Sequence, residues 1–467
     1  MRLNGLGCLL ASHATIELLP PELLVIIFTL VHAETYGIFS QSWRNDPLSP
    51  TTFPYALASV CNLWQDVMST VPQFWTRIVV FIDSNSFSLS NLPSHLEWSQ
   101  DLPFQITVVN RSCSDAIHID NGEKARVRQA IDALGPHLQR CSSLQFDLAY
   151  TSSLPSIYAD IFHGRVFPNL RSIIFEARVG DGPGSSFRHD LSSNIWCEEN
   201  PLPELRCLVL DGFNYVDLCE HHADWFLSMT EDEGRLKEAS ISHFKQSQRD
   251  EQHKFSFYDG CIYLKDVAYL KLSSLDFTWD LNDPDADNLE FSELRVLMLE
   301  DLSWQLAREV LSRCEFVSVV SIVRCAIGEI SDVTLFAYSL ILEDIPASPN
   351  FPQFLAQWEG FHLTIRDCPS FDDRALENCI MAPDSLYSPV VLGNLTIHNC
   401  PNFSVKRLKH LIGVQIEQCH RLDRPEVGCL VYLKVTGRGP FLSDEDRKWF
   451  TNNVESFGGW DTHQNVF

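Results

Sequence analysis

Along most of the chain, apolar residues recur in the spacing apolar-x-x-apolar-x-apolar. The alternation that ends each occurrence predicts a short β-strand with one face turned inward. The last apolar positions follow one another at intervals of 19 to 35 residues, which leaves room for a returning segment. The occurrences are Cys141/Leu144/Phe146, Leu170/Ile173/Phe175, Leu205/Leu208/Leu210, Leu236/Ala239/Ile241, Val267/Leu270/Leu272, Leu294/Leu297/Leu299, Val317/Val320/Ile322, Ala337/Leu340/Leu342, a weaker Leu363/Ile365, Leu392/Leu395/Ile397, Leu411/Val414/Ile416 and Leu430/Leu433/Val435.

Repeats of this length are typical of a solenoid, in which each unit buries its apolar face on its neighbours. The earlier intervals allow a full helix in each unit, and the shorter later ones allow only a turn. We therefore expect an α/β fold with an irregular, bent horseshoe. Three inserts interrupt it at about 178–200, 245–258 and 279–290, and binding residues in such arrays usually lie on strand faces and inserted loops.

Four of the predicted strands place a cysteine three residues after the strand isoleucine. These cysteines are Cys325, Cys368, Cys400 and Cys419. The pattern resembles the cysteine-containing type of leucine-rich repeat, in which this position packs against the turning backbone. We predict a buried ladder of thiols here rather than metal or redox ligands.

A second pattern occupies the N-terminal part of the chain. Pro20 and Pro21 fit the start of a helix, and Glu22 suits its first turn. Apolar residues then follow on nearly every side of this helix, so that it needs cover on more than one side. One side can face its own core and the other a partner. One predicted stripe contains Leu24, Ile27, Phe28 and Val31, and Leu23, Ile26 and Leu30 widen it.

A polar insert at 36–54 follows this helix. A second helix is predicted from Tyr55 to Met68, with Val60 and Trp64 among its apolar positions, and Pro72 ends it. Residues 78–82 then predict a strand.

These N-terminal residues resemble an F-box in the form common among mushroom-forming fungi, and leucine-rich repeats often accompany that module. The resemblance covers about 65 residues, from the Leu19–Leu24 segment to Trp75. It implies a three-helix unit that binds a Skp-type adaptor and, through it, the cullin of an SCF-type ubiquitin ligase. The repeats would then bind an unknown target protein. The implied adaptor-binding residues are Leu19, Pro20, Leu23, Leu24, Ile27, Phe28, Leu30, Val60 and Trp64.

The expected organisation is a tail at 1–15, an F-box-like domain at 16–82, the repeat array at 83–440 and a C-terminal cap or tail at 441–467. The helical module also has a second interpretation. Repeat arrays need a cap over their first apolar face, so the chain can be a ligase-independent scaffold that binds a protein and uses these helices as a cap.

Composition narrows the choice of partners. The formal charge of −26 repels phosphate backbones and anionic lipid, so we expect neither nucleic-acid nor membrane binding, while basic patches on a protein partner remain compatible. The 15 cysteines include no C-x-x-C pair, which favours reduced thiols in an intracellular, cytoplasmic or nuclear protein.

No residues suggest catalysis or a cofactor. The acidic segment that begins at Asp283 lacks the glycine and the glutamate of a calcium loop. The set Cys219, Glu220, His221, His222 and Asp224 fits the polar side of a helix better than a metal site. Nucleophile elbows and phosphate-binding glycine loops are missing from the sequence. We expect a protein that is not an enzyme.

Overall fold

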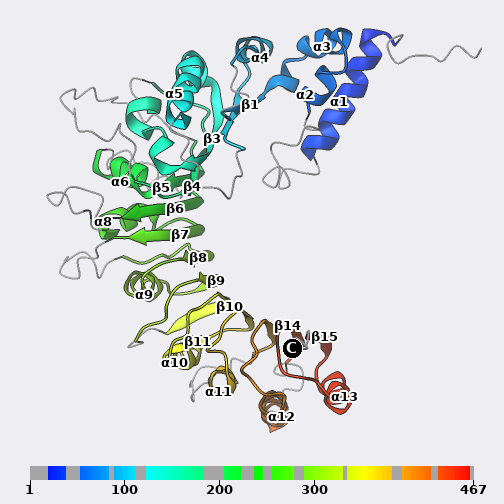
Figure 1. Cartoon of the computed structure of the whole chain (residues 1–467), viewed down its shortest axis with the longest axis vertical. Helices are drawn as coiled ribbons and strands as arrows, with labels where there is room; N and C mark the ends of the chain where they lie inside the picture. Colours follow the sequence, from blue (N-terminus) through cyan, green and yellow to red (C-terminus); the bar gives the residue numbers. More distant parts are fainter. Residues whose placement is uncertain are drawn as a thin grey trace, which may run out of the picture. The chain divides into compact units, whose positions relative to one another are not determined.

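The computed structural model describes residues 19–37, 53–83, 89–111, 122–162, 165–182, 204–221, 236–245, 255, 257–277, 289–329, 334–380, 392–421 and 430–462. Within these ranges the fold is mixed α/β, with one open sheet of 15 parallel strands and accompanying helices (Figure 1). Two compact units divide the chain: Met1–Leu144 with Phe167–Leu170, and Gln145–Val166 with Arg171–Phe467.

The first unit begins with a small helical cluster. Eight buried apolar side chains form its core, and Phe28 meets Trp64 edge-to-face with ring centroids 5.0 Å apart. The core consists of Leu24, Phe28, Phe53, Trp64, Val67, Met68, Phe74 and Trp75. The elements of this unit are α1 (Pro21–Gly37), α2 (Tyr55–Ala58), α3 (Asn62–Ser69), the 3-10 turn η3 (Pro72–Trp75), β1 (Arg77–Phe81), α4 (Leu92–Trp98), β2 (Phe104–Val109), α5 (Glu123–Leu134) and η4 (Gly135–Arg140). The predicted strand at 78–82 is confirmed by β1, which pairs with β2 in parallel.

The prediction of one helix from Tyr55 to Met68 is wrong, because the chain breaks between α2 and α3. Cys61 takes an extended backbone with φ of −162° and serves as the N-cap of α3. Ser59, Val60 and Cys61 are all weak helix formers, so little propensity opposes the break. With this geometry Leu57, Ala58 and Cys61 still pack on the core, whereas Val60 is exposed.

The strand β3 (Cys141–Tyr150) crosses the division between the units. The second unit then continues with β4 (Ser172–Val179), β5 (Cys207–Asp211), α6 (Gly212–His221), β6 (Glu238–Lys245), α8 (Phe257–Cys261), β7 (Tyr269–Asp276), β8 (Val296–Glu300), α9 (Trp304–Ser312), β9 (Val317–Val323), β10 (Leu335–Glu343), α10 (Phe351–Ala356), β11 (Trp358–Glu359), β12 (His362–Arg366), α11 (Asp373–Ile380), β13 (Asn394–His398), α12 (Val405–Arg421), β14 (Tyr432–Gly437), α13 (Asp444–Asn453) and β15 (Ser456–Thr462).

Neighbouring strands of the second unit pair in parallel and in chain order, with β11 attached to β10. Their registers align the predicted apolar positions into two buried columns. The first column contains Leu270, Leu297, Val320, Leu340, Leu363, Leu395 and Leu433. The second contains Leu272, Leu299, Ile322, Leu342, Ile365, Ile397 and Val435, each buried. In eleven of the twelve predicted apolar patterns, the last two apolar positions lie in a strand.

The prediction of a strand at Leu411/Val414/Ile416 is wrong, because these residues lie in α12. Among the described side chains of this helix, the buried ones are Leu408, Leu411, Ile412 and Gln415, which follow the spacing of one helical face. A helical spacing fits these buried residues as well as a strand spacing fits the three predicted positions. The helix that contains them is 17 residues long. Cys419 consequently belongs to α12 and not to a ladder.

Left-handed residues lie at or near the ends of seven strands of the second unit: five directly follow a strand, and two lie near the ends of β6 and β7. His243, Ser274, Asp301, Arg324, Asp344, Asp367 and Asn399 have φ between 51° and 56°. From Asp301 onward the amide of this residue still donates to the next strand, as Arg324 N does to Glu343 O at 2.9 Å. The chain then turns inward, and the following residue is buried.

That inward position explains the cysteine ladder. Cys325, Cys368 and Cys400 each directly follow a left-handed residue and are buried. The Cys325 thiol lies 3.3 Å from Val323 O, and the Cys368 thiol lies 3.1 Å from Arg366 O. Burial raises the pKa of Cys368 to about 12, and that of Cys325 and Cys400 to about 11. The buried ladder is confirmed for these three members.

The left-handed positions give a stability prediction. Asp344 is exposed and has φ of 52°. Replacing it with valine should cost about 1–2 kcal/mol, because a β-branched side chain collides with its own backbone in this region. Urea-induced unfolding of Asp344→Val measures the loss.

Two variants control for other causes. Asp344→Gly should retain most of the stability, because glycine adopts this backbone without collision. Thr364→Val, inside β12, should stay within about 0.5 kcal/mol of the original chain. Equal stability of Asp344→Val and the original chain would refute the backbone explanation.

Candidate protein-interaction surfaces

The helix α1 carries two apolar stripes with different surroundings. Leu24 and Phe28 are buried in the helical cluster, and Val31 packs against it. The second stripe is exposed: Leu23 by 46%, Ile26 by 55%, Ile27 by 37% and Leu30 by 65%. These four residues lie at i, i+3, i+4 and i+7, which places them along one side of the helix. We call them the exposed α1 face.

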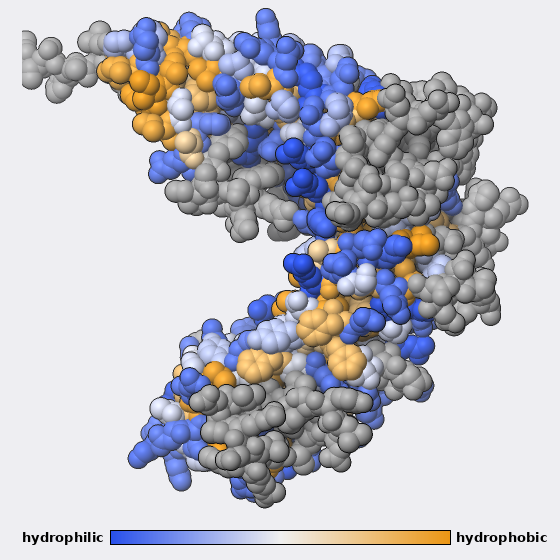
Figure 2. Space-filling view, turned by 180° about the vertical axis from the view of Figure 1, so that it is seen from behind, coloured by the Kyte–Doolittle hydropathy of each residue, from blue (hydrophilic) through white to orange (hydrophobic). Residues whose placement is uncertain are grey.

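The exposed α1 face forms an apolar patch in the first unit. Figure 2 shows orange side chains gathered over the N-terminal helices. Val60 and Leu63, at the junction of α2 and α3, are also exposed large apolar residues. Solvent-exposed apolar residues grouped in this way are typical of a surface that binds another protein.

The structure separates the nine implied adaptor-binding residues into two groups. Pro20, Leu23, Ile27, Leu30 and Val60 are exposed, and Leu19 is half-buried against the cluster. By contrast, Leu24, Phe28 and Trp64 are buried in the core of the cluster, so their side chains support α1 from inside.

Two exposed apolar residues of this unit were missed among the implied contacts. Ile26 belongs to the exposed α1 face, and Leu63 lies beside Val60 in the chain. Ile27 was expected on the same stripe as Leu24 and Phe28, but it lies on the exposed side. Residues 21–34, projected around a helix axis, fall into these two stripes. The prolines at the start of the helix show where that projection begins.

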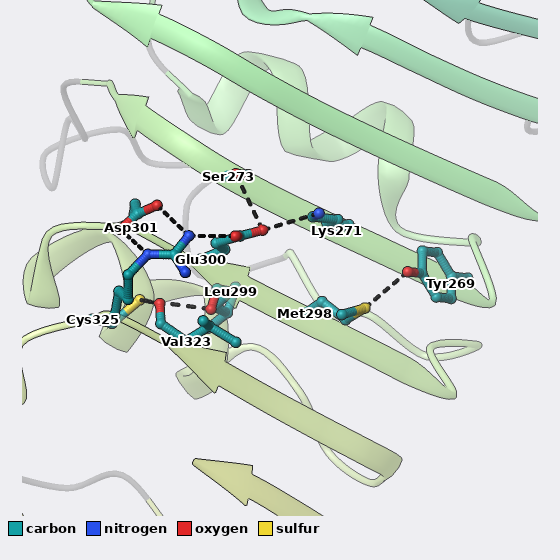
Figure 3. A network of polar contacts seen from close by, with 10 residues as sticks. Tyr269, Lys271, Ser273, Met298, Leu299, Glu300, Asp301, Val323 and Cys325 are labelled. Atoms are coloured by element: carbon teal, nitrogen blue, oxygen red, sulfur yellow. Dashed lines mark hydrogen bonds and ion pairs between the residues drawn. The ribbon is translucent and has the colours of Figure 1, made fainter. Parts of the chain in front are cut away.

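In the second unit, the strands β7, β8 and β9 carry a polar network (Figure 3). Lys271 Nζ lies 2.9 Å from Glu300 Oε2, and Arg324 bonds to the other oxygen of Glu300. Arg324 also donates to both oxygens of Asp301, at 2.9 and 2.8 Å. Two cations and two carboxylates thus balance one another, so that this network has no spare charge to attract a ligand.

The charges in the network shift their own protonation equilibria. Burial alone would raise the pKa of the Glu300 carboxyl, but its bonds to Lys271 and Arg324 outweigh burial and lower that pKa. The carboxylates of Asp301 and Glu300 raise the pKa of Arg324. The network is therefore charged at neutral pH and ties three neighbouring strands together.

The described part of the chain contains neither a metal-ligand cluster nor a membrane-spanning helix. Within it, no group of three His, Cys, Asp or Glu side chains is placed to hold a metal ion, and no helix is long and apolar enough to cross a membrane. The set that begins at Cys219 was expected on the polar side of a helix: α6 contains Cys219, Glu220 and His221, but Cys219 is buried and so does not lie on that side. His222, Asp224, the acidic segment at Asp283 and most of the three inserts lie outside the described residues, as does the insert between Gly37 and Phe53.

A comparison of the chain with protein-family models found no match, and a comparison with curated proteins found none either.

The network on β7–β9 gives a pH prediction. The folded pKa of Glu300 lies below its unfolded value, so its stabilisation is present above the ordinary glutamate pKa and lost as the pH falls through the folded pKa. Glu300→Gln should lower the free energy of unfolding at neutral pH by about 1 kcal/mol or less, since the pairs are partly exposed. Urea unfolding at a series of pH values measures this difference.

The difference between the two proteins should shrink toward zero in acid, where Glu300 itself is protonated. In a Lys271→Met background the same substitution should cost less, because one partner is already absent. A difference that stays constant from neutral to acidic pH would exclude the ion pairs as its cause.

Proposed function

We propose that this chain is the substrate-recognition adaptor of a cullin–RING ubiquitin ligase of the SCF type. The exposed α1 face would bind a Skp-type adaptor, and the strand array of the second unit, which we interpret as a leucine-rich-repeat solenoid, would bind the target protein. The observation that carries the proposal is the second apolar stripe of α1. Leu23, Ile26, Ile27 and Leu30 stay in solvent although the helix already buries Leu24 and Phe28.

Exposed apolar side chains of this size have a free-energy reason to find a partner. Removing one leucine from water contributes about 1.5–3 kcal/mol, and four such residues along one helix make a sufficient centre for a protein interface. A helix with this stripe fits the helix-in-groove and helix-packing modes of recognition. The resemblance of Leu19–Leu24 to the start of an F-box names the kind of partner.

The chain would act by positioning. The ligase chemistry belongs to other subunits, and this chain would raise the local concentration of the target near them. The two binding surfaces belong to different compact units, so each can bind its partner through residues of its own.

The alternative is a scaffold that binds a protein without a ligase, with the N-terminal helices as a cap. The burial of Leu24, Phe28 and Trp64 in a cluster that also packs Trp98 of α4 favours a structural role for these helices. A cap accounts for the buried stripe of α1, but it leaves the exposed stripe without a purpose. We therefore favour the adaptor function.

The test is co-purification of the full chain with a Skp-type adaptor. Leu30→Glu places a charge on the most exposed residue of the α1 face and should weaken the complex at least tenfold, because it removes about 1.4 kcal/mol or more of apolar burial. Circular dichroism and thermal unfolding should remain as in the original chain, since Leu30 is not part of the core.

Thr29→Glu is the matched control. It adds the same charge on the same helix at an exposed position, about 100° around the axis from Leu30. It should leave adaptor binding within about twofold of the original. A folded chain that binds no Skp-type adaptor would refute the ligase function. Point variants are preferable to deletion of 1–82, because that deletion removes β1 and exposes its partner β2.

A further inference from the structure

A row of aromatic side chains lies on the second unit where β9, β10 and β12 begin. Phe316 is exposed by 62%, Phe336 by 42% and Tyr338 by 50%, and Phe361 is half-exposed. We call these four residues the aromatic strip. Figure 2 shows exposed orange and pale side chains at the height that β9 to β11 have in Figure 1. Large aromatic residues are costly to leave in water, so the strip requires an explanation.

The backbone holds two of these rings in a fixed arrangement. Phe361 N donates to Tyr338 O at 3.0 Å, and the two rings lie nearly parallel, with centroids 5.7 Å apart and planes 9° apart. The Phe361 ring lies over Gly393, where an added Cβ would come within 2.0 Å of it. Gly393 N donates in turn to Phe361 O at 3.0 Å. The rings are thus positioned before any ligand arrives.

An acidic residue lies beside the strip on a neighbouring strand. Glu359 is the register partner of Phe336 in the β10–β11 pair. His362 contacts both the Tyr338 and the Phe361 ring, and burial lowers its pKa, so it is neutral at neutral pH.

The cations of the described residues do not use these rings. Arg324 is bound by Glu300 and Asp301, and Arg366 is bound by Glu343 at 3.0 Å. Cations lie over the rings of Phe81, Phe104 and Trp449, but within the described part of the chain none lies over a ring of the strip.

We propose that the aromatic strip binds an extended segment of the target protein that carries arginine or lysine side chains. Aromatic faces are negative and attract a cation placed over them, and acidic neighbours add to this attraction. The planar guanidinium also stacks on aromatic rings, so arginine fits better than lysine. The inference rests on the proposed function, because it names the class of target for the unit that would select it.

The test uses three fluorescein-labelled peptides of equal length, in which serine alternates with arginine, with proline or with glutamate. Fluorescence anisotropy with the full chain, at physiological salt, reports binding. The arginine peptide should bind most tightly. Tyr338→Ala combined with Phe361→Ala should weaken it roughly tenfold, because two cation–π contacts are lost. Glu359→Lys should also weaken it.

The matched control is Phe441→Ala, which removes an aromatic residue exposed by 69% outside the strip. It should change the affinity for the arginine peptide by less than about twofold. This control separates binding at the strip from the general attraction of a cationic peptide to an acidic protein. Three results would overturn the inference: no binding of the arginine peptide, equal weakening in both alanine variants, or equal or tighter binding of the proline peptide.

The result stays separate from the adaptor test. The variants of the strip lie in the second unit and should leave co-purification with a Skp-type adaptor unchanged, whereas Leu30→Glu should leave peptide binding unchanged. Failure of one test with success of the other therefore identifies which surface was misassigned.

Discussion

No strand of the second unit has a core of its own, and this constraint governs the rest of its structure. Each strand contributes two inward apolar side chains, such as Leu340 and Leu342 in β10, and they are buried by the equivalent pairs before and after them. Parallel pairing in chain order is the arrangement that lets each pair meet two neighbours. The left-handed residue at the strand end follows from the same requirement. The chain must turn toward the core there, while the amide of this residue still donates to the next strand.

The period of the apolar pattern made most of this fold predictable. A column of buried side chains requires an apolar residue at the same place in each strand. The resulting spacing of apolar residues is visible in a single sequence. The strand prediction at 411–416 was wrong because a six-residue pattern cannot distinguish a strand from part of a longer amphipathic helix. The break at Cys61 was missed because an extended N-cap cysteine has no strong sequence signal. The strip of Phe316, Phe336, Tyr338 and Phe361 was missed because Tyr338 and Phe361 meet only through the register of β10 and β12.

The exposed α1 face was predictable in composition but not in orientation. Apolar residues on every side of the helix indicated two contacts, and only the packing of Phe28 on Trp64 shows which residues remain outside. The proposed adaptor face and the aromatic strip differ in chemistry as well as in place. The first is purely aliphatic and suits the packing of another helix. The second combines aromatic rings with carboxylates and suits a cationic, extended chain.

The buried thiols also allow the local opening of the second unit to be measured. Cys325, Cys368 and Cys400 follow β9, β12 and β13, and a thiol with so high a pKa in the core is inert to alkylating reagents while its strand stays closed. Each thiol becomes reactive only when its own part of the sheet opens. The rate of alkylation at each cysteine therefore equals a local opening equilibrium multiplied by a common chemical rate. Three natural residues can thus record where along the sheet a bound protein slows local unfolding, without the introduction of any label.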